Sequence, residues 1–274
     1  MARPIITFTS DFGLDDWFVG VVHGVLHEGC PDARVVDLTH AVPPGHLAHA
    51  AFVIEAAAPD FPAGTVHLVV VDPGVGTSRR ALAANAHGFW FVAPDNGVLE
   101  WALADPAAEV RVLENEKYFR PPVSRTVHGR DVFAPVAAAL ARGEPAEELG
   151  PRVRDPVRLA RPVHDPRGGG GGRSGDLAGL VMYIDRFGNV LTNLDSGSIE
   201  RAFPGVPEGD LEVLAGGRRI SGLARSYGDA RVGTVVAIIG SSGRLEIAQV
   251  GGAADSRLGL GVGDTVRMRR RGAA

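Results

Sequence analysis

The densest chemical signal in the chain is an acid that is followed, seven residues later, by an arginine. A run of apolar residues ends at Asp72, Pro73-Gly74 turns the backbone, and the adjacent Arg79 and Arg80 close the segment. The turn could bring Asp72 and Arg79 to one pocket. It could equally leave them as a surface ion pair that contributes about 0–1 kcal/mol. The spacing does not choose between these interpretations.

A histidine is the second candidate. His128 lies directly before a predicted helix that begins near Asp131, where it could act as a base. Alternatively, Asp131 only stabilises the helix N-terminus and His128 takes no part. No HExxH or HxH pattern occurs, and the i,i+4 pair His23 and His27 has no evident third ligand, so the sequence predicts no metal site.

Two segments of the second half carry groups that suit a ligand. Asp185, Phe187 and Asn189 follow a predicted strand, and an aromatic ring beside an amide suits a flat nitrogenous base. The hydroxyls of Ser241 and Ser242 could bind a carboxylate. A polar β-turn and a plain hairpin turn are the alternatives.

The elements that must position these groups differ between the two halves. Over the first 160 residues strands alternate with helices, which predicts an α/β layered domain with a mainly parallel sheet. The predicted strands are 4–9, 34–38, 65–71, 89–93 and 109–113, and the predicted helices are 16–28, 46–58 and 132–142. Functional loops follow the carboxyl ends of such strands, where Asp11, Asp72 and Asp95 lie.

The composition changes at a run of five glycines, 168–172. This run predicts a flexible linker, because a phosphate-binding loop would need a following Lys-Ser/Thr and a helix start. Short strands separated by glycine-rich turns follow, which is typical of a small all-β barrel. The expected strands are 177–184, 212–214, 218–220, 234–239 and 245–250. We therefore expect an α/β domain over 1–165, a linker over 166–175 and a β-barrel over 176–274.

Composition narrows the class of protein. The 274 residues are 45% hydrophobic and 22% charged, as in ordinary globular proteins, and the net charge of -4 provides no basic field for nucleic acid. The single cysteine, Cys30, allows no internal disulfide. No apolar run reaches about 18 residues, and the N-terminus reads as a strand rather than a signal peptide. We expect a cytoplasmic protein without a membrane or nucleic-acid partner.

Six segments occur in a recognisable order along the chain: TSDFG (9–13), VVDPGVGTSRR (70–80), APDNGVL (93–99), VHGRDVFAP (127–135), DRFGNVLTN (185–193) and SSGRLEIA (241–248). Together they resemble one family, the S-adenosyl-L-methionine (SAM) hydrolases that form adenosine, also called SAM hydroxide adenosyltransferases. This family is related to SAM-dependent fluorinases and chlorinases.

The resemblance implies roles for single residues. It implies a hydrolytic set of Asp72, Arg79 and His128. It implies that Asp11 holds the ribose hydroxyls, Asp185 the methionine ammonium, Asn189 the adenine edge, Ser241 and Ser242 the methionine carboxylate, and that Asn96 and Phe187 line the pocket. It also implies a homotrimer in which each active site lies between the N-terminal domain of one subunit and the C-terminal domain of its neighbour.

One departure separates hydrolase from halogenase. The halogenating relatives carry Tyr-Pro and Thr-Gly-Thr where this chain has Asp72-Pro73 and Val75-Gly76-Thr77. The resemblance therefore implies hydrolysis of SAM to adenosine and methionine without a cofactor. A SAM-dependent halogenase and a non-catalytic SAM- or adenosine-binding protein are the alternatives. The sequence does not separate Arg79 from Arg80 as the functional arginine.

Overall fold

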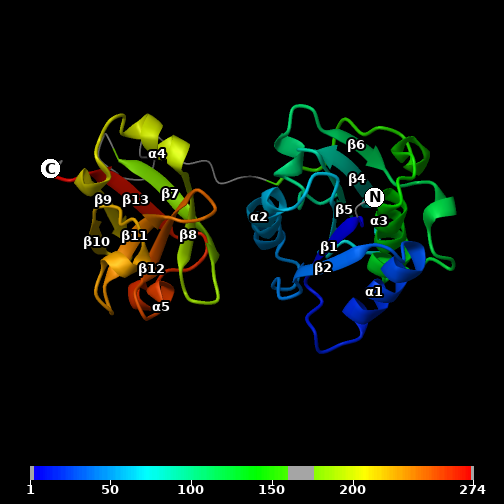
Figure 1. Cartoon of the computed structure of the whole chain (residues 1–274), viewed down its shortest axis with the longest axis horizontal. Helices are drawn as coiled ribbons and strands as arrows, with labels where there is room; N and C mark the ends of the chain where they lie inside the picture. Colours follow the sequence, from blue (N-terminus) through cyan, green and yellow to red (C-terminus); the bar gives the residue numbers. More distant parts are fainter. Residues whose placement is uncertain (1–2, 160–175, 273–274) are drawn as a thin grey trace. The chain divides into compact units, whose positions relative to one another are not determined.

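The computed structural model describes residues 3–159 and 176–272. The chain divides into two compact units, Met1–Leu159 and Ala160–Ala274 (Figure 1). The linker predicted for 166–175 lies outside the described residues. Within the described ranges, no helix has both the length and the apolar character needed to cross a membrane.

The first unit is built on a six-stranded sheet with the order β2-β1-β3-β5-β4-β6. Neighbours in the run β2-β1-β3-β5 are parallel, whereas β4 is antiparallel to both β5 and β6. The strands are β1 (Ile5–Ser10), β2 (Arg34–Thr39), β3 (Val66–Val70), β4 (Ala81–Ala86), β5 (Phe89–Pro94) and β6 (Glu109–Val112). The helices are α1 (Phe18–Gly29), α2 (Leu47–Ala57) and α3 (Ala134–Ala141).

Helices cover both faces of this sheet, which is why every residue of the central strand β3 is buried and all but His67 are apolar. Along β3, Val66, Leu68 and Val70 join the core that α1 and α3 complete. Val69 faces the opposite core, to which α2 contributes. Figure 1 shows α2 on one side of the sheet and α1 with α3 on the other. Because side chains alternate along a strand, a sheet buried on both faces needs a continuous apolar run.

The second unit is a seven-stranded antiparallel sheet with the order β10-β9-β13-β7-β8-β12-β11. The end strands β10 and β11 contact each other, so the sheet nearly closes into a barrel. The strands are β7 (Leu177–Ile184), β8 (Val190–Asp195), β9 (Leu211–Ala215), β10 (Arg218–Ser221), β11 (Val235–Ile239), β12 (Arg244–Gln249) and β13 (Thr265–Arg270). Two short helices, α4 (Ser196–Ala202) and α5 (Ala254–Leu258), complete the unit.

The predicted fold class is confirmed: a layered α/β unit with a mainly parallel sheet is followed by a small all-β barrel. Three strands, β4, β8 and β13, were not predicted from the sequence. The predicted helix over 132–142 divides into one turn of π-helix, η4 (Gly129–Phe133), and α3. Strands β1 and β3 run parallel side by side, so Asp11 and Asp72, which follow them, meet at one edge of the sheet.

Candidate active site

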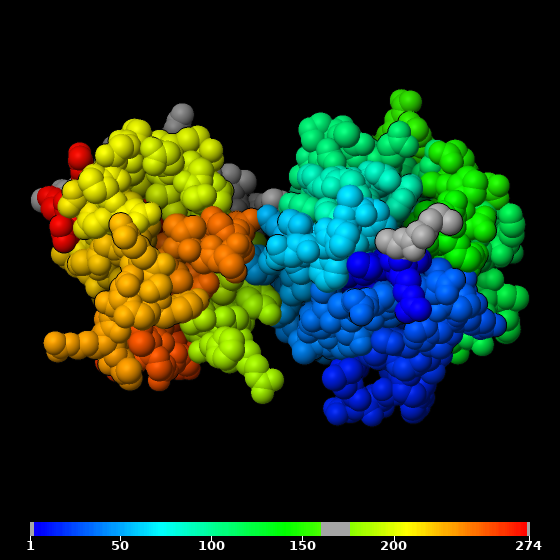
Figure 2. Space-filling model, viewed as in Figure 1, coloured from blue at the N-terminus to red at the C-terminus, as the bar shows by residue number. Residues whose placement is uncertain are grey.

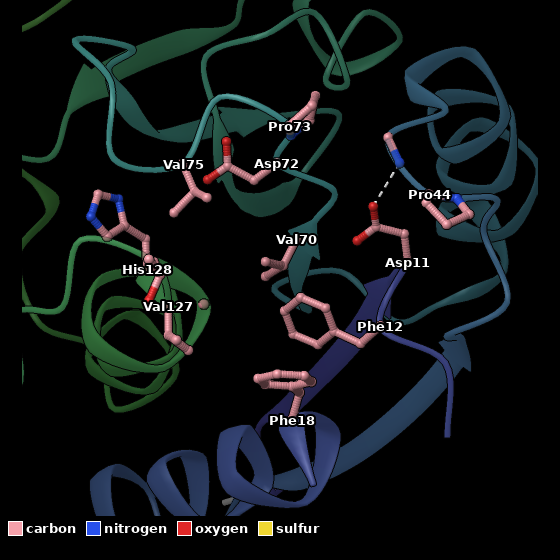
Figure 3. Close-up of a pocket in the computed structure, with 13 residues that line it drawn as sticks. Asp11, Phe12, Phe18, Pro44, Val70, Asp72, Pro73, Val75, Val127 and His128 are labelled. Carbon is pink, nitrogen blue, oxygen red and sulfur yellow. Dashed lines mark hydrogen bonds between the residues drawn. The ribbon is translucent and has the colours of Figure 1, made fainter. Parts of the chain in front are cut away.

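The carboxyl ends of β1 and β3 open into a pocket of about 440 Å³. Figure 3 shows Asp11 on one side of this pocket, His128 on the other and Asp72 between them. The pocket is lined by Asp11, Phe12, Phe18, Pro44, Gly45, Val70, Asp72, Pro73, Val75, Thr126, Val127, His128 and Gly129. The volume lies within the range of small-molecule sites, and a few polar groups converge on mainly apolar walls, as such sites require.

Arg79 joins the acid and the histidine into one hydrogen-bonded unit. Its Nε donates to both carboxylate oxygens of Asp72, at 2.9 and 3.1 Å, and its Nη2 donates to Oδ2 of the same carboxylate. Nη2 also lies 2.8 Å from Nδ1 of His128. The side chains of Asp72 and Arg79 are only 7% and 10% exposed, so this is a buried, charge-assisted pair rather than a solvated surface bridge.

The contact with Arg79 sets the protonation of His128. A guanidinium has no acceptor, so Nδ1 must accept and the ring proton lies on Nε2. Burial, followed by the positive charge of Arg79, lowers the pKa of His128 below its ordinary value of 6.5. His128 is therefore a neutral imidazole at neutral pH, with Nε2–H as its remaining polar group.

The structure separates the two adjacent arginines. Arg80 turns to other partners: its Nε donates to Asp95 at 2.7 Å, and its Nη1 donates to Asp155 at 2.9 Å. Arg79 instead lies with its guanidinium 5.1 Å from the ring centroid of the buried Phe133, a cation–π contact that restrains its plane. Arg79 is thus the arginine that contacts the candidate catalytic groups.

The opposite side of the pocket is formed by Asp11 and two aromatic rings. Oδ2 of Asp11 accepts a hydrogen bond of 2.8 Å from the backbone N–H of Gly45 (Figure 3). The rings of Phe12 and Phe18 lie with their centroids 5.7 Å apart and form an apolar wall. At Gly129 an added Cβ would lie 3.3 Å from Phe12 and 3.1 Å from Val70, so glycine keeps this wall open.

Asn96 does not line this pocket. Its Nδ2 donates to the carbonyl oxygen of Val71 at 2.9 Å, and its Oδ1 accepts from the backbone N–H of Val98 at 3.2 Å. The amide therefore braces the end of β3, one residue before Asp72. Asn96 thus supports the strand end, and the pocket-lining contact that the resemblance implies for it stays a prediction.

The second unit carries its own cavity, of about 600 Å³, at the turn between β7 and β8. Asp185 organises this turn: it accepts hydrogen bonds of 2.8 to 2.9 Å from the backbone N–H groups of Phe187 and Asn189 and from the side-chain amide of Asn189. The cavity is lined by Asp185, Phe187, Asn189, Tyr227, Gln249, Val250, Gly251, Gly252 and Ala253. The turn projects from the surface of its unit (Figure 2). The side chain of Phe187, within this turn, is 75% exposed.

Gly188 lets this turn pack closely. Its φ is +78°, and an added Cβ would lie 2.5 Å from both the Cβ of Ala253 and Oδ1 of Asp255. Both the left-handed backbone and the lack of space require glycine here. The turn is thereby held against the start of α5.

Ser241 and Ser242 lie apart from that cavity's lining, in the turn between β11 and β12. Ser241 is exposed. Oγ of Ser242 is buried and has no hydrogen-bond partner within the described ranges. An unpaired buried hydroxyl is costly, so this oxygen is a site for an added acceptor or donor.

Tyr227 and Glu246 are site residues that sequence reasoning missed. The hydroxyl of Tyr227 donates to Oε1 of Glu246, and burial raises the pKa of Tyr227 to about 12. Burial and the neighbouring charge of Asp185 also raise the pKa of Glu246. A glutamate between the apolar residues Leu245 and Ile247 of strand β12 was the available signal. Tyr227 lines the cavity beside Asp185, and Glu246 holds its hydroxyl.

Comparison with known protein families identifies the family of this chain. The model for the SAM hydroxide adenosyltransferase N-terminal domain matches residues 6–150, and that for the C-terminal domain matches residues 179–267. The chain belongs to the SAM hydroxide adenosyltransferase family.

The proteins similar to this chain include some named as SAM hydrolases and some named as fluorinases. A protein of Thermus thermophilus named (R)-S-adenosyl-L-methionine hydrolase is 46% identical, and the match covers 97% of this chain and 99% of that protein. One of the same name from Salinispora tropica is 41% identical over 97% of each chain. A fluorinase of an Actinoplanes species is 29% identical over 90% of this chain and 91% of its own. The resemblance read from the sequence is confirmed.

A solved structure supports the fold. A conserved protein of Thermotoga maritima superposes with a TM-score of 0.89 at 36% identity, covering 97% of this chain and 100% of that one.

Proposed function

We propose that this chain hydrolyses SAM to adenosine and L-methionine by in-line attack of water on C5′ of the ribose. The observation that carries the proposal is the hydrogen-bonded unit of Asp72, Arg79 and His128 at the edge of the 440 Å³ pocket. Relatives at 40–46% identity over nearly the whole chain are named (R)-S-adenosyl-L-methionine hydrolase, which supports the same reaction.

The reaction needs a base and no acid. The oxygen of water bonds to C5′, the C5′–S bond breaks, and its electron pair neutralises the sulfonium to give methionine's thioether. A neutral leaving group needs no proton, whereas the attacking water must lose one. Since a saturated carbon offers no carbonyl or phosphoryl oxygen to polarise, we propose that no cofactor takes part in the reaction.

The geometry supports a distinct role for each of the three groups. Asp72 lines the pocket and retains acceptor capacity beyond its bonds to Arg79, so it accepts the proton of water. His128 offers Nε2–H as a donor that orients the water oxygen. Arg79 does not line the pocket and acts as a positioning residue that holds both partners. A placed base contributes about 10²–10⁴-fold, and fixing water against substrate contributes roughly 7–11 kcal/mol.

The binding roles follow the resemblance. Asp11 would hold the ribose hydroxyls, Asp185 the methionine ammonium and Asn189 the adenine edge, with the ring of Phe187 against the base. Ser241 and Ser242 would hold the methionine carboxylate, and the unpaired Oγ of Ser242 supports this role. Asn96 would contact the bound ligand as the resemblance implies, and its amide braces the strand end.

Assembly is part of the proposal. The reacting groups lie in the first unit and the adenine and methionine groups in the second. We propose a homotrimer in which each site combines the first unit of one subunit with the second unit of its neighbour. Large apolar side chains support such a contact: Leu14 and Trp17 beside the first half-site are 76% and 70% exposed, and Phe187 in the second is also exposed. The lone buried Cys30 is in keeping with the cytoplasm.

Product analysis tests the reaction. The purified protein is incubated with SAM alone and with fluoride or chloride, and products are identified chromatographically. Adenosine and methionine in every arm support the proposal. A 5′-halogenated adenosine would instead show a halogenase, an outcome that Asp72 in place of a tyrosine argues against. SAM that is bound but unchanged would show a binding protein. Asp72→Asn, which keeps the shape of the side chain, is the matched inactive control.

A further inference from the structure

Two histidines and a carboxylate from separate elements meet on the first unit, outside the pocket lining. Nε2 of His23, on α1, lies 2.8 Å from Oδ1 of Asp37, on β2. Nε2 of His40, in the loop after β2, lies 3.0 Å from the same oxygen. All three ligand atoms lie within 4.8 Å of one another. The i,i+4 neighbour His27 is not part of the cluster.

His40 directs a buried nitrogen at this cluster. The residue is 5% exposed, and within the described ranges Oδ1 of Asp37, at 3.0 Å, is the one polar partner of its Nε2. Its other nitrogen, Nδ1, lies 2.7 Å from Oγ of the buried Ser10. If Nδ1–H donates to that hydroxyl, Nε2 keeps a free lone pair aimed at Asp37. A metal-ligating histidine uses its second nitrogen in this way.

From this arrangement we infer a zinc site formed by His23, Asp37 and His40. Two imidazoles and a carboxylate are donors that Zn²⁺ accepts, and bonds of about 2.0–2.1 Å place tetrahedral donors roughly 3.4 Å apart. The two histidine–carboxylate separations need to open by only about half an ångström to reach that spacing. The side chains of His23 and Asp37 are 28% and 38% exposed, so the ion can enter and water can supply the fourth ligand.

The proposed role is structural. The carbonyl oxygen of His40 accepts a hydrogen bond of 2.8 Å from the N–H of Gly13, and its ring contacts Ser10. These two residues flank Asp11, so an ion on His40 would tie α1 and β2 to the segment that carries the proposed ribose ligand. None of the three ligands lines the pocket, and the ion takes no part in the hydrolysis.

The competing interpretation is a metal-free hydrogen-bonded network. In that arrangement His40 would carry its proton on Nε2, directed at Asp37, and Nδ1 would accept from the hydroxyl of Ser10. Both arrangements hold the same side chains together, so stability alone does not distinguish them. A measurement of zinc binding distinguishes them directly.

Zinc binding to chelator-treated protein is the test, measured by calorimetry and by competition with a chromophoric chelator. We expect one Zn²⁺ per chain and a rise in melting temperature with zinc. His23→Asn and Asp37→Asn should each weaken binding at least about 10-fold, whereas His27→Asn, one helical turn from His23, should bind as the wild type does. Cobalt(II) should give the visible absorption of a tetrahedral nitrogen–oxygen site.

The outcomes are distinct. Absence of stoichiometric zinc in the wild type, or equal affinity in His23→Asn and Asp37→Asn, would overturn the site. Circular dichroism verifies that the variants fold. If they do not fold, the cobalt spectrum of the wild type decides. An octahedral all-oxygen spectrum would then count against the proposal. No assay uses SAM, so failure here leaves the proposed hydrolysis untouched.

Discussion

The guanidinium of Arg79 lies 2.8 Å from Nδ1 of His128 while it also holds both carboxylate oxygens of Asp72. The acid and the histidine are therefore linked through a shared donor and not directly. One consequence is that His128 is fixed as the Nε2–H tautomer. Another is that displacement of Arg79 disturbs both pocket-lining groups together.

Arg79→Lys should lower kcat/KM by about 10–100-fold, because an ammonium cannot reproduce the forked contacts to two partners, and small misplacements of reacting groups cost this much. The matched control is Arg80→Lys, whose partners are Asp95 and Asp155. It should keep near wild-type kcat/KM. Steady-state kinetics of the two variants is the measurement, and equal losses would contradict the assignment of Arg79.

The pH profile reports on His128. Protonation of Nδ1 would remove the acceptor that Arg79 uses and place two positive charges together. Because the pKa of His128 is lowered, activity should persist at pH 6.5 and fall only below it. His128→Asn keeps an acceptor for Arg79 but loses the imidazole Nε2–H that orients the water, so it should be at least about 10-fold slower. Because asparagine does not titrate, the variant should also lack this acidic limb of the pH profile. An unchanged limb in the variant would assign it to another group.

Acid stability should depend on a buried histidine far from the chemistry. His67 is fully buried between Phe89 and Phe91, and burial lowers its pKa from 6.5 to about 4. The unfolded chain therefore binds a proton at a higher pH than the folded chain does. Stability is fully present above pH 6.5 and falls as the pH drops towards 4, by roughly 3 kcal/mol in total.

His67→Phe isolates this contribution. It removes the titrating group and also the 2.8 Å contact with Oγ1 of Thr7, and the second effect is independent of pH over this range. Urea unfolding at several pH values should show that on acidification the wild type loses more unfolding free energy than the variant does, by about that amount. Parallel curves for the two proteins would contradict the assignment.

Mixed assemblies test the shared site. In a ring that mixes Asp72→Ala and Asn189→Ala subunits, one interface joins an intact first unit to an intact second unit. Equal mixing after dissociation should restore roughly a quarter of wild-type activity, since three quarters of the rings are mixed and each regains one of three sites. Asp72→Ala mixed with His128→Ala, both altered in the first unit, should restore none. Failure of the first pair, or an active species that sediments as a monomer, would exclude the shared site.

The sequence predicted those features that depend on local pattern. Asp72 follows an apolar run and His128 precedes a helix, so the sequence predicted their places at a strand end and a helix start, whereas it left open whether they face a pocket. Strand β4 was missed because its residues, Ala81–Ala86, are mostly alanine and lack a β pattern. Ala-rich segments carry no period of two, and only pairing with β5 and β6 defines this strand.

Other features of the site depend on tertiary contacts, which the sequence pattern does not contain. Arg79 and Arg80 are chemically identical neighbours, and only the positions of Asp72 and Asp95 separate them. Helical spacing paired His23 with His27, whereas the fold brings Asp37 and His40 to His23 from another strand and loop. Nothing in the sequence indicated that the side-chain amide of Asn96 donates to the carbonyl oxygen of Val71.

The most direct test of the proposed reaction follows the oxygen of water. SAM is turned over in water enriched in heavy oxygen, and the products are analysed by mass spectrometry with fragmentation of the ribose. In-line attack at C5′ predicts that adenosine carries one heavy oxygen, on its 5′ hydroxyl, and that methionine carries none. Unlabelled adenosine, or methylthioadenosine with labelled homoserine, would contradict attack of water at C5′.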